Sequence, residues 1–95
     1  MNNEMKAILD NFDITNEEYN KILSFLENMD YDYHNNKDIS KYDYESYVSS
    51  IIGDQNSHYP AEQIAIELYK MGEYKELIKN EIYKHNTKVL SELCN

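Results

Sequence analysis

The stretch from Tyr44 to Gly53, YESYVSSIIG, has the clearest structural pattern in the chain. Its large apolar residues recur at intervals of three and four positions: Tyr44, Tyr47, Val48, Ile51 and Ile52. This spacing places them on one face of an amphipathic helix. Glycine suits the left-handed backbone that commonly follows a helix end, so this helix is predicted to stop at Gly53.

The segments before this helix repeat the same spacing. Two further apolar faces are formed by Met5, Ile8, Leu9 and Phe12, and by Tyr19, Ile22, Leu23 and Leu26. The second face follows the sequence Thr15-Asn16-Glu17-Glu18, a capping box in which the side chains of Thr15 and Glu18 each satisfy a backbone amide at a helix start. We therefore expect two amphipathic helices ahead of Tyr44.

The segments after Gly53 are also predicted to be helical. Pro60 suits a first helical turn, and Gly72 is expected to end the helix that starts there. The apolar positions are Ala61, Ile64, Ala65 and Leu68, then Tyr74, Leu77, Ile78 and Ile82, and finally Val89, Leu90 and Leu93. A polar break at His85-Asn86-Thr87 leaves two interpretations of the last part, one bent helix or two helices.

The segment from Ile64 to Ile78, IAIELYKMGEYKELI, resembles one helix-turn-helix unit of the tetratricopeptide class. Leu68 and Tyr69 precede its turn, Gly72 lies in the turn and Tyr74 follows it. A second copy at the period of about 34 residues is absent, and a lone unit cannot stack into a solenoid. The resemblance therefore implies a helical hairpin and no family function.

These patterns predict an all-α fold: a single acidic helical domain over residues 1–95, built as a small bundle of four to five short helices. The polar composition from Asp30 to Lys41 predicts a long acidic, Tyr-rich loop between helices 2 and 3. The aromatic stretches Tyr31–Tyr33 and Tyr42–Tyr44 leave a small β-hairpin as an alternative. The only cysteine, Cys94, cannot form an intramolecular disulfide, so the apolar core must hold the fold.

Negative charge is concentrated in the first two-thirds of the chain. Residues 1–68 contain 14 acidic residues and 4 lysines, whereas residues 69–95 contain 4 acidic residues and 5 lysines, within a total net charge of −9. The stretch from Asp30 to Tyr47 has five of the ten tyrosines, five carboxylates and two lysines, and the chain has no arginine. This charge repels phosphate backbones and anionic lipids, so we expect a basic protein surface as partner, no direct nucleic-acid contact and no membrane. Surplus acid that only keeps a small protein soluble is the other explanation.

The candidate partner-binding residues are the acidic and aromatic side chains of this stretch: Asp30, Tyr31, Asp32, Tyr33, Asp38, Tyr42, Asp43 and Glu45. Interfaces are enriched in tyrosine because its rigid ring buries a large area at a small entropic cost. Three of the tyrosines, at 31, 33 and 42, lie off the helical stripes, which fits either contact with a partner or packing across the loop. The tyrosines on the stripes are predicted to be core residues: Tyr19, Tyr44, Tyr47 and Tyr74.

No pattern for catalysis, a metal ion or a cofactor is found in the sequence. Asp30, Asp32 and His34 alternate like the start of a calcium loop, but Asn35 stands where glycine is required and Lys41 where a bidentate glutamate is required. The three histidines lack the spacing of a zinc site, and two glycines do not make a phosphate loop. We therefore expect that the protein is not an enzyme and uses no metal or cofactor.

These features predict a small inhibitor that binds a basic, nucleic-acid-binding protein and blocks it stoichiometrically. Carboxylates along a helix and a loop imitate the phosphates of DNA, and aromatic rings replace its bases. The Lys-, Asn- and Ile-rich composition suits a phage product that blocks a CRISPR effector or a restriction enzyme, by analogy with anti-CRISPR and antirestriction proteins as a class. A cytoplasmic location is expected because no signal-peptide pattern and no apolar run of about 20 residues occurs.

Two other functional classes fit the same sequence. One is an immunity protein or antitoxin that neutralises a basic nuclease toxin. The other is a helical adaptor or regulatory module that binds a partner helix through the hairpin from Tyr69 to Leu93.

Overall fold

The computed structural model describes residues 2–53 and 58–94. These residues form six α-helices, one π-helical turn and no strand. The elements are α1 (Asn3–Asn11), α2 (Asn16–His34), α3 (Lys41–Ile52), α4 (Tyr59–Lys70), α5 (Lys75–Leu77), the π-helical turn η1 (Ile78–Ile82) and α6 (Thr87–Leu93). The predicted all-α fold is confirmed, with six helices instead of four to five. The hairpin alternative is wrong, because Tyr31–Tyr33 lie in α2 and Tyr42–Tyr44 lie in α3.

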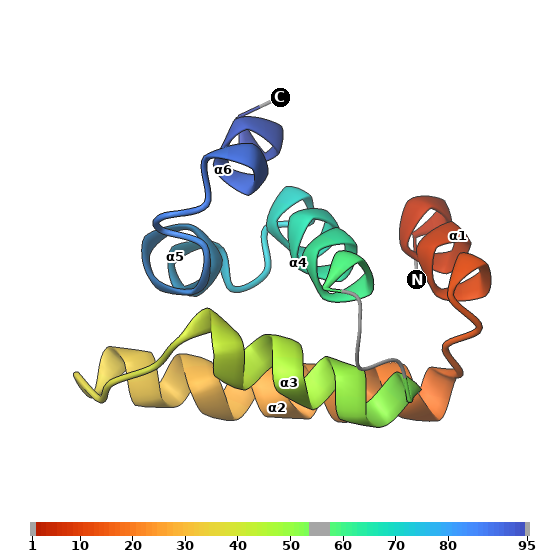
Figure 1. The fold of residues 1–95 in the computed structure, drawn as a ribbon, viewed down its shortest axis with the longest axis horizontal. Helices are drawn as coiled ribbons and strands as arrows, with labels where there is room; N and C mark the ends of the chain where they lie inside the picture. The colour runs from red at the N-terminus through yellow and green to blue at the C-terminus, as the bar shows by residue number, and fades with distance from the viewer. Residues whose placement is uncertain (1, 54–57, 95) are drawn as a thin grey trace.

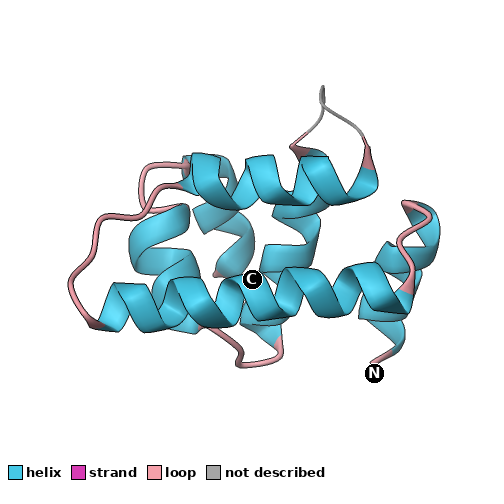
Figure 2. Cartoon of the chain, turned by 90° about the horizontal axis from the view of Figure 1, so that it is seen from below, coloured by secondary structure: helices cyan, strands magenta, loops and turns pink. Residues whose placement is uncertain are grey.

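The helices are arranged in two layers. Figure 1 shows α2 and α3 side by side and antiparallel along the longest axis of the molecule, with α1, α4, α5 and α6 on one side of this pair. In the view from below, the α2–α3 pair lies in front of the other helices (Figure 2). Helix α4 is central to the second layer, since it contacts α1, α3 and α6. The opposite face of the α2–α3 pair is consequently left open to solvent.

The helix start and stop signals predicted from the sequence are present in the structure. The Thr15 hydroxyl accepts a hydrogen bond from the Glu18 amide at 3.1 Å, and the Glu18 carboxylate accepts one from the Thr15 amide at 2.9 Å. Gly53 has a φ of 76° directly after α3, and Pro60 lies in the first turn of α4. The polar break at His85-Asn86-Thr87 separates η1 from α6. A new helix starts there because the Asn86 side chain accepts a hydrogen bond from the Val89 amide and caps α6.

The loop between α2 and α3 is shorter than the sequence predicted. Helix α2 continues through His34, so residues 30–34 are helical and only residues 35–40 form the connection. The helix is sustained because Met29 and Tyr33 continue the apolar face of α2 and pack against the core. It ends where the side chains of His34 and Asn35 donate to the carbonyls of Asp30 and Tyr31, both at 2.8 Å. The carbonyls left open by the helix end are satisfied by backbone amides, since Asp32 accepts from Lys37 at 3.0 Å and Tyr33 accepts from Asn36 at 3.2 Å.

The core lies between the two layers and draws on every helix. Its buried apolar side chains are Met5, Leu9, Ile14, Tyr19, Ile22, Leu26, Met29, Tyr44, Val48, Ala61, Ile64, Ala65, Ile66, Leu68, Leu77, Ile78, Ile82, Tyr83, Val89 and Leu93. Of the four tyrosines predicted to be core, Tyr19 and Tyr44 are buried, and Tyr47 and Tyr74 pack partly buried against the cluster. The Tyr44 hydroxyl donates to the Ala61 carbonyl at 2.8 Å, which joins α3 to α4.

A π-helical turn places Tyr83 in this core. Leu77 and Ile82 are both buried, as are Ile78 and Tyr83, and each pair is five residues apart. An α-helix with 3.6 residues per turn would direct residues five apart to different faces. The Tyr83 amide instead donates to the Ile78 carbonyl at 3.0 Å, the i to i+5 bond of a π-helix. The wider turn therefore keeps all four side chains on the buried side.

Candidate functional site

The exposed face of the α2–α3 pair contains a groove at the end where the two helices are joined. Tyr42 and Ser46 line it, and each is two residues from buried Tyr44, which corresponds to roughly 200° around an α-helix. The cavity measures about 490 Å³. We call it the α2–α3 groove, and its lining residues are Phe25, Asn28, Met29, Asp32, Asp38, Ile39, Tyr42, Asp43, Ser46 and Tyr47.

Four of the eight candidate partner-binding residues meet at this groove. Asp32 comes from the last turns of α2, Asp38 from the connecting loop, and Tyr42 and Asp43 from the first turn of α3. The Tyr42 side chain is among the most exposed large hydrophobic groups of the protein, at 72%. Residues that are 11 positions apart in the chain are thus brought to one opening because α2 and α3 pack antiparallel.

The floor of the groove is apolar and aromatic. The rings of Phe25 and Tyr47 are stacked, with centroids 4.2 Å apart and planes 8° from parallel. Met29 and Ile39 complete the apolar lining. A second hollow of about 580 Å³ lies along α2 and also includes Phe25, Asn28 and Tyr47 in its lining. The stacked pair is therefore shared by two adjacent hollows on the same helix pair.

The acidic groups at the groove are held by local interactions. Ser40 and Asp43 form a capping box at the start of α3, in which the Asp43 carboxylate accepts the Ser40 amide at 3.3 Å. Asp32 lies 3.5 Å from the Lys37 ammonium group in an ion pair whose two side chains are both exposed. Within residues 2–53 and 58–94, Asp38 takes part in no ion pair. The groove is thus lined by three carboxylates, one of which is paired with an exposed ammonium group.

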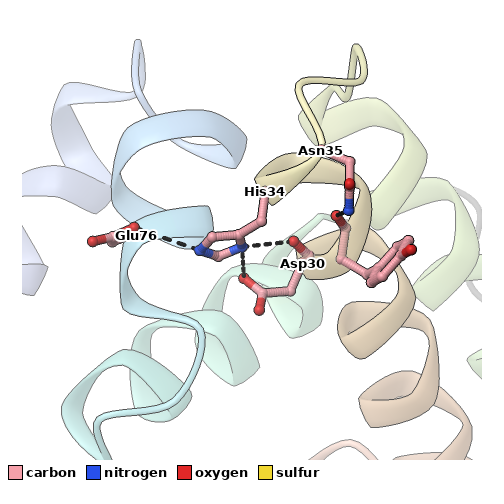
Figure 3. Close-up of polar contacts among 5 residues, drawn as sticks. Asp30, His34, Asn35 and Glu76 are labelled. Atoms are coloured by element: carbon pink, nitrogen blue, oxygen red, sulfur yellow. Dashed lines mark hydrogen bonds and ion pairs between the residues drawn. The ribbon is translucent and has the colours of Figure 1, made fainter.

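Asp30 belongs to a different contact, at the junction of α2 and α5. Its carboxylate lies 3.6 Å from Nδ1 of His34, and Nε2 of His34 lies 3.7 Å from the Glu76 carboxylate (Figure 3). The bond to the Asp30 carbonyl, with the nearby Asp30 and Glu76 charges, raises the pKa of His34 above its ordinary value. A protonated imidazole in the last turn of α2 also interacts favourably with the negative end of the helix dipole. Asp30 therefore takes part in contacts around His34 instead of lining the groove.

Tyr31 and Tyr33 also lie outside the groove. Tyr31 is 68% exposed on α2, within two turns of the groove residues along the chain. Tyr33 is half-buried against the core and meets the His34 ring edge-on at 5.2 Å. The two interpretations offered by the sequence thus apply to different residues: Tyr33 packs, whereas Tyr31 and Tyr42 are exposed.

Glu45 is buried, and it must be removed from the candidate surface. Its residue exposure is 3%, its Oε2 accepts the Tyr83 hydroxyl at 3.0 Å, and its Oε1 lies 3.5 Å from Nδ1 of His58. Burial and the neighbouring Glu45 and Tyr44 groups raise the pKa of Tyr83 far above its ordinary value, so this phenol remains a donor. The sequence contained a signal for this burial, because Glu45 and Ser49 are four residues apart and flank the apolar stripe of α3. The structure shows that both residues are buried. The hydrogen-bond partner of Glu45, Tyr83, lies 38 residues later and could not be recognised from the sequence.

The residues that the structure describes contain neither a metal site nor a membrane-spanning helix, and the chain matches no known protein. Among the residues that the structure describes, no three side chains of His, Cys, Asp or Glu are placed to hold a metal ion together. None of the helices in the described ranges has the length and hydropathy that a membrane span requires. No protein-family model matches the chain, and no match is found among curated proteins or solved structures.

Proposed function

We propose that the protein is a small acidic inhibitor that binds a basic, nucleic-acid-binding protein and blocks it stoichiometrically, in the manner of anti-CRISPR and antirestriction proteins. The observation that carries this proposal is the α2–α3 groove, where three carboxylates and an exposed tyrosine surround an apolar floor on an otherwise open helix face. The intended target is a nuclease or CRISPR effector in the cytoplasm.

The electrostatics of the chain support a cationic target. The net charge is −9, and the groove residues lie within the part that holds 14 of the 18 acidic residues. A negative field of this kind accelerates the encounter with a partner of opposite charge and is screened by salt. In this proposal the carboxylates at the groove take the place of backbone phosphates, which carry about one charge per 3.4 Å on each strand. A DNA-binding surface would then accept the inhibitor in place of its ligand.

The packing gives less support to the adaptor alternative. That function requires an open apolar groove between Tyr69 and Leu93, but most large apolar residues of this segment are buried in the core. The immunity-protein alternative uses the same acidic face and differs only in the identity of the target. A nuclease toxin as the captured partner would favour it.

The experiment compares two variants that each lose three acidic charges. The groove variant carries Asp32→Asn, Asp38→Asn and Asp43→Asn, and asparagine retains an oxygen acceptor at each position. The control variant carries Asp10→Asn, Asp13→Asn and Glu73→Gln, all at exposed positions outside the α2–α3 groove. Asp13 has a φ of 55°, a backbone conformation that asparagine tolerates well.

Each immobilised protein is incubated with lysate from the natural host, and the retained proteins are identified and quantified. We expect the wild type and the control variant to retain the same basic nucleic-acid-binding protein, and the groove variant to lose it. The purified target is then titrated with the inhibitor in a DNA-binding assay, where DNA binding should end at a fixed molar ratio. Equal retention by both variants, or a target that still binds DNA when saturated with the protein, would contradict the proposal.

A further inference from the structure

The α2–α3 groove combines an apolar, aromatic floor with a negatively charged rim. Its floor is formed by the stacked rings of Phe25 and Tyr47 with the apolar side chains of Met29 and Ile39. Its rim carries negative charge. The volume of about 490 Å³ falls within the range of roughly 300–1,000 Å³ typical of clefts that bind small molecules, so one side chain fits inside it. A purely electrostatic contact would need the charge but not the apolar floor.

We infer that this groove seats a single arginine side chain that projects from the basic surface of the partner. The inference rests on the proposed function, since it specifies how the same face recognises its target. Arginine has an apolar stem of three methylene groups and a planar, permanently charged head. The stem matches the apolar floor, and the head matches the carboxylates.

The aromatic groups favour arginine over lysine. A guanidinium group is planar and weakly hydrated, and it stacks on aromatic faces, whereas an ammonium group is a compact, strongly hydrated point charge. Tyr42 at the rim is 72% exposed, so its ring is accessible to cover a cation bound in the groove. Cation–π contact adds to the attraction of the carboxylates when the head is partly withdrawn from water.

The carboxylates at the rim can accept a new cation without dismantling the fold. Asp38 has no ion-pair partner in the described part of the chain. Asp32 would give up its ion pair with Lys37 to bind the new cation. That pair is exposed and 3.5 Å long, and such pairs contribute little to stability. Asp43 keeps its bond to the Ser40 amide, because one carboxylate has capacity for several donors. The rim therefore offers at least two carboxylates to the five donors of one guanidinium group.

The probes are three capped pentapeptides, Ser-Gly-Xaa-Gly-Ser, in which Xaa is arginine, lysine or citrulline. Citrulline has the shape of arginine without the charge. Each peptide is titrated into the isotopically labelled protein at low ionic strength, and binding is followed by NMR shifts of backbone amides and side chains. We expect saturable shifts at Phe25, Met29 and Tyr47 with the arginine peptide, weaker binding of the lysine peptide, and no saturation with citrulline.

Two exposed tyrosines provide the matched pair of variants. Tyr42→Ala should weaken arginine-peptide binding about two- to fivefold, the size expected for one exposed cation–π contact. Tyr31→Ala removes an equally exposed ring outside the groove and should leave the affinity unchanged. Because both side chains lie on the surface, neither substitution should change the far-ultraviolet circular dichroism spectrum.

The outcomes separate this inference from the proposed function. Three results would each refute arginine binding in the groove. They are equal binding of the arginine and citrulline peptides, shifts centred outside the groove, and an equal effect of the two tyrosine variants on affinity. If these occur while the groove variant still loses a basic partner from lysate, the inhibitor proposal stands and only the seat is rejected. Saturable arginine binding without any basic partner would reject the inhibitor and retain the seat.

Discussion

Replacing Tyr83 with phenylalanine tests the buried link between η1 and α3. The substitution removes only the hydroxyl that donates to Glu45 at 3.0 Å, and it leaves the fully buried ring and its edge-on contact with Tyr44 in place. The Glu45 carboxylate then stays buried with one hydrogen-bond donor fewer. The substitution therefore isolates the energetic contribution of one polar contact in the core.

The expected loss follows from the burial of both partners. A hydrogen bond to a charged group contributes about 1.5–3 kcal/mol, and a buried acceptor left without its donor adds a desolvation penalty. His58, whose Nδ1 lies 3.5 Å from the other carboxylate oxygen, offsets part of this penalty. We expect Tyr83→Phe to lower the free energy of unfolding by about 2 kcal/mol. For a domain of this size that corresponds to a decrease in Tm of roughly 8–16 °C.

The assay is urea and thermal denaturation followed by circular dichroism, with Tyr31→Phe as the control. Tyr31 is 68% exposed, so loss of its hydroxyl should change the free energy of unfolding by less than about 0.5 kcal/mol. The reasoning is refuted if Tyr83→Phe is as stable as Tyr31→Phe. That result would mean that the contact between Tyr83 and Glu45 has no net stabilising effect.

Two further predictions concern Glu67 and Gly53. Burial and the adjacent Glu4 raise the pKa of Glu67 above its ordinary 4.5. The folded state therefore binds this proton more tightly than the unfolded state does. As a result, the free energy of unfolding falls as pH rises from 4.5 through the raised pKa. Glu67→Gln should therefore be more stable than the wild type at neutral pH and less pH-dependent in urea denaturation; an unchanged pH profile would contradict this. Gly53→Ala should lower the free energy of unfolding by about 1–2 kcal/mol, because the φ of 76° is unfavourable for a residue with a Cβ atom. Steric clash does not contribute, since nothing lies within 4 Å of the added carbon. A stability equal to that of the wild type would show that the left-handed conformation is not required.

Local signals predicted most helix boundaries correctly. The capping box at Thr15, the stop at Gly53 and the proline in the first turn of α4 all depend on neighbouring residues, so they are visible in sequence. The end of α2 was predicted too early because Asp30 and Asp32, with Asn35 and Asn36 after them, are residue types common in loops. The deciding contact was tertiary: Tyr33 continues the face of Met29 onto the core.

The candidate surface was predicted in part, and its errors arise from contacts over long sequence distances. Four of the eight residues singled out by charge and tyrosine content line the α2–α3 groove. The sequence did not reveal that Phe25 and Tyr47 stack to form its floor, since they lie on separate helices. It also placed Glu45 on the surface, because the compensating Tyr83 depends on a π-helical turn that a 3.6-residue period does not describe.

The most direct test of the account is the association rate of the captured basic partner as a function of salt concentration, measured for the wild type and for the two triple variants. At low salt we expect the wild type and the control variant to associate at similar rates that fall steeply as salt is added. The groove variant should associate about tenfold more slowly and show a flatter salt dependence. Three identical rate profiles would show that the carboxylates of the α2–α3 groove do not guide the partner, which contradicts the account.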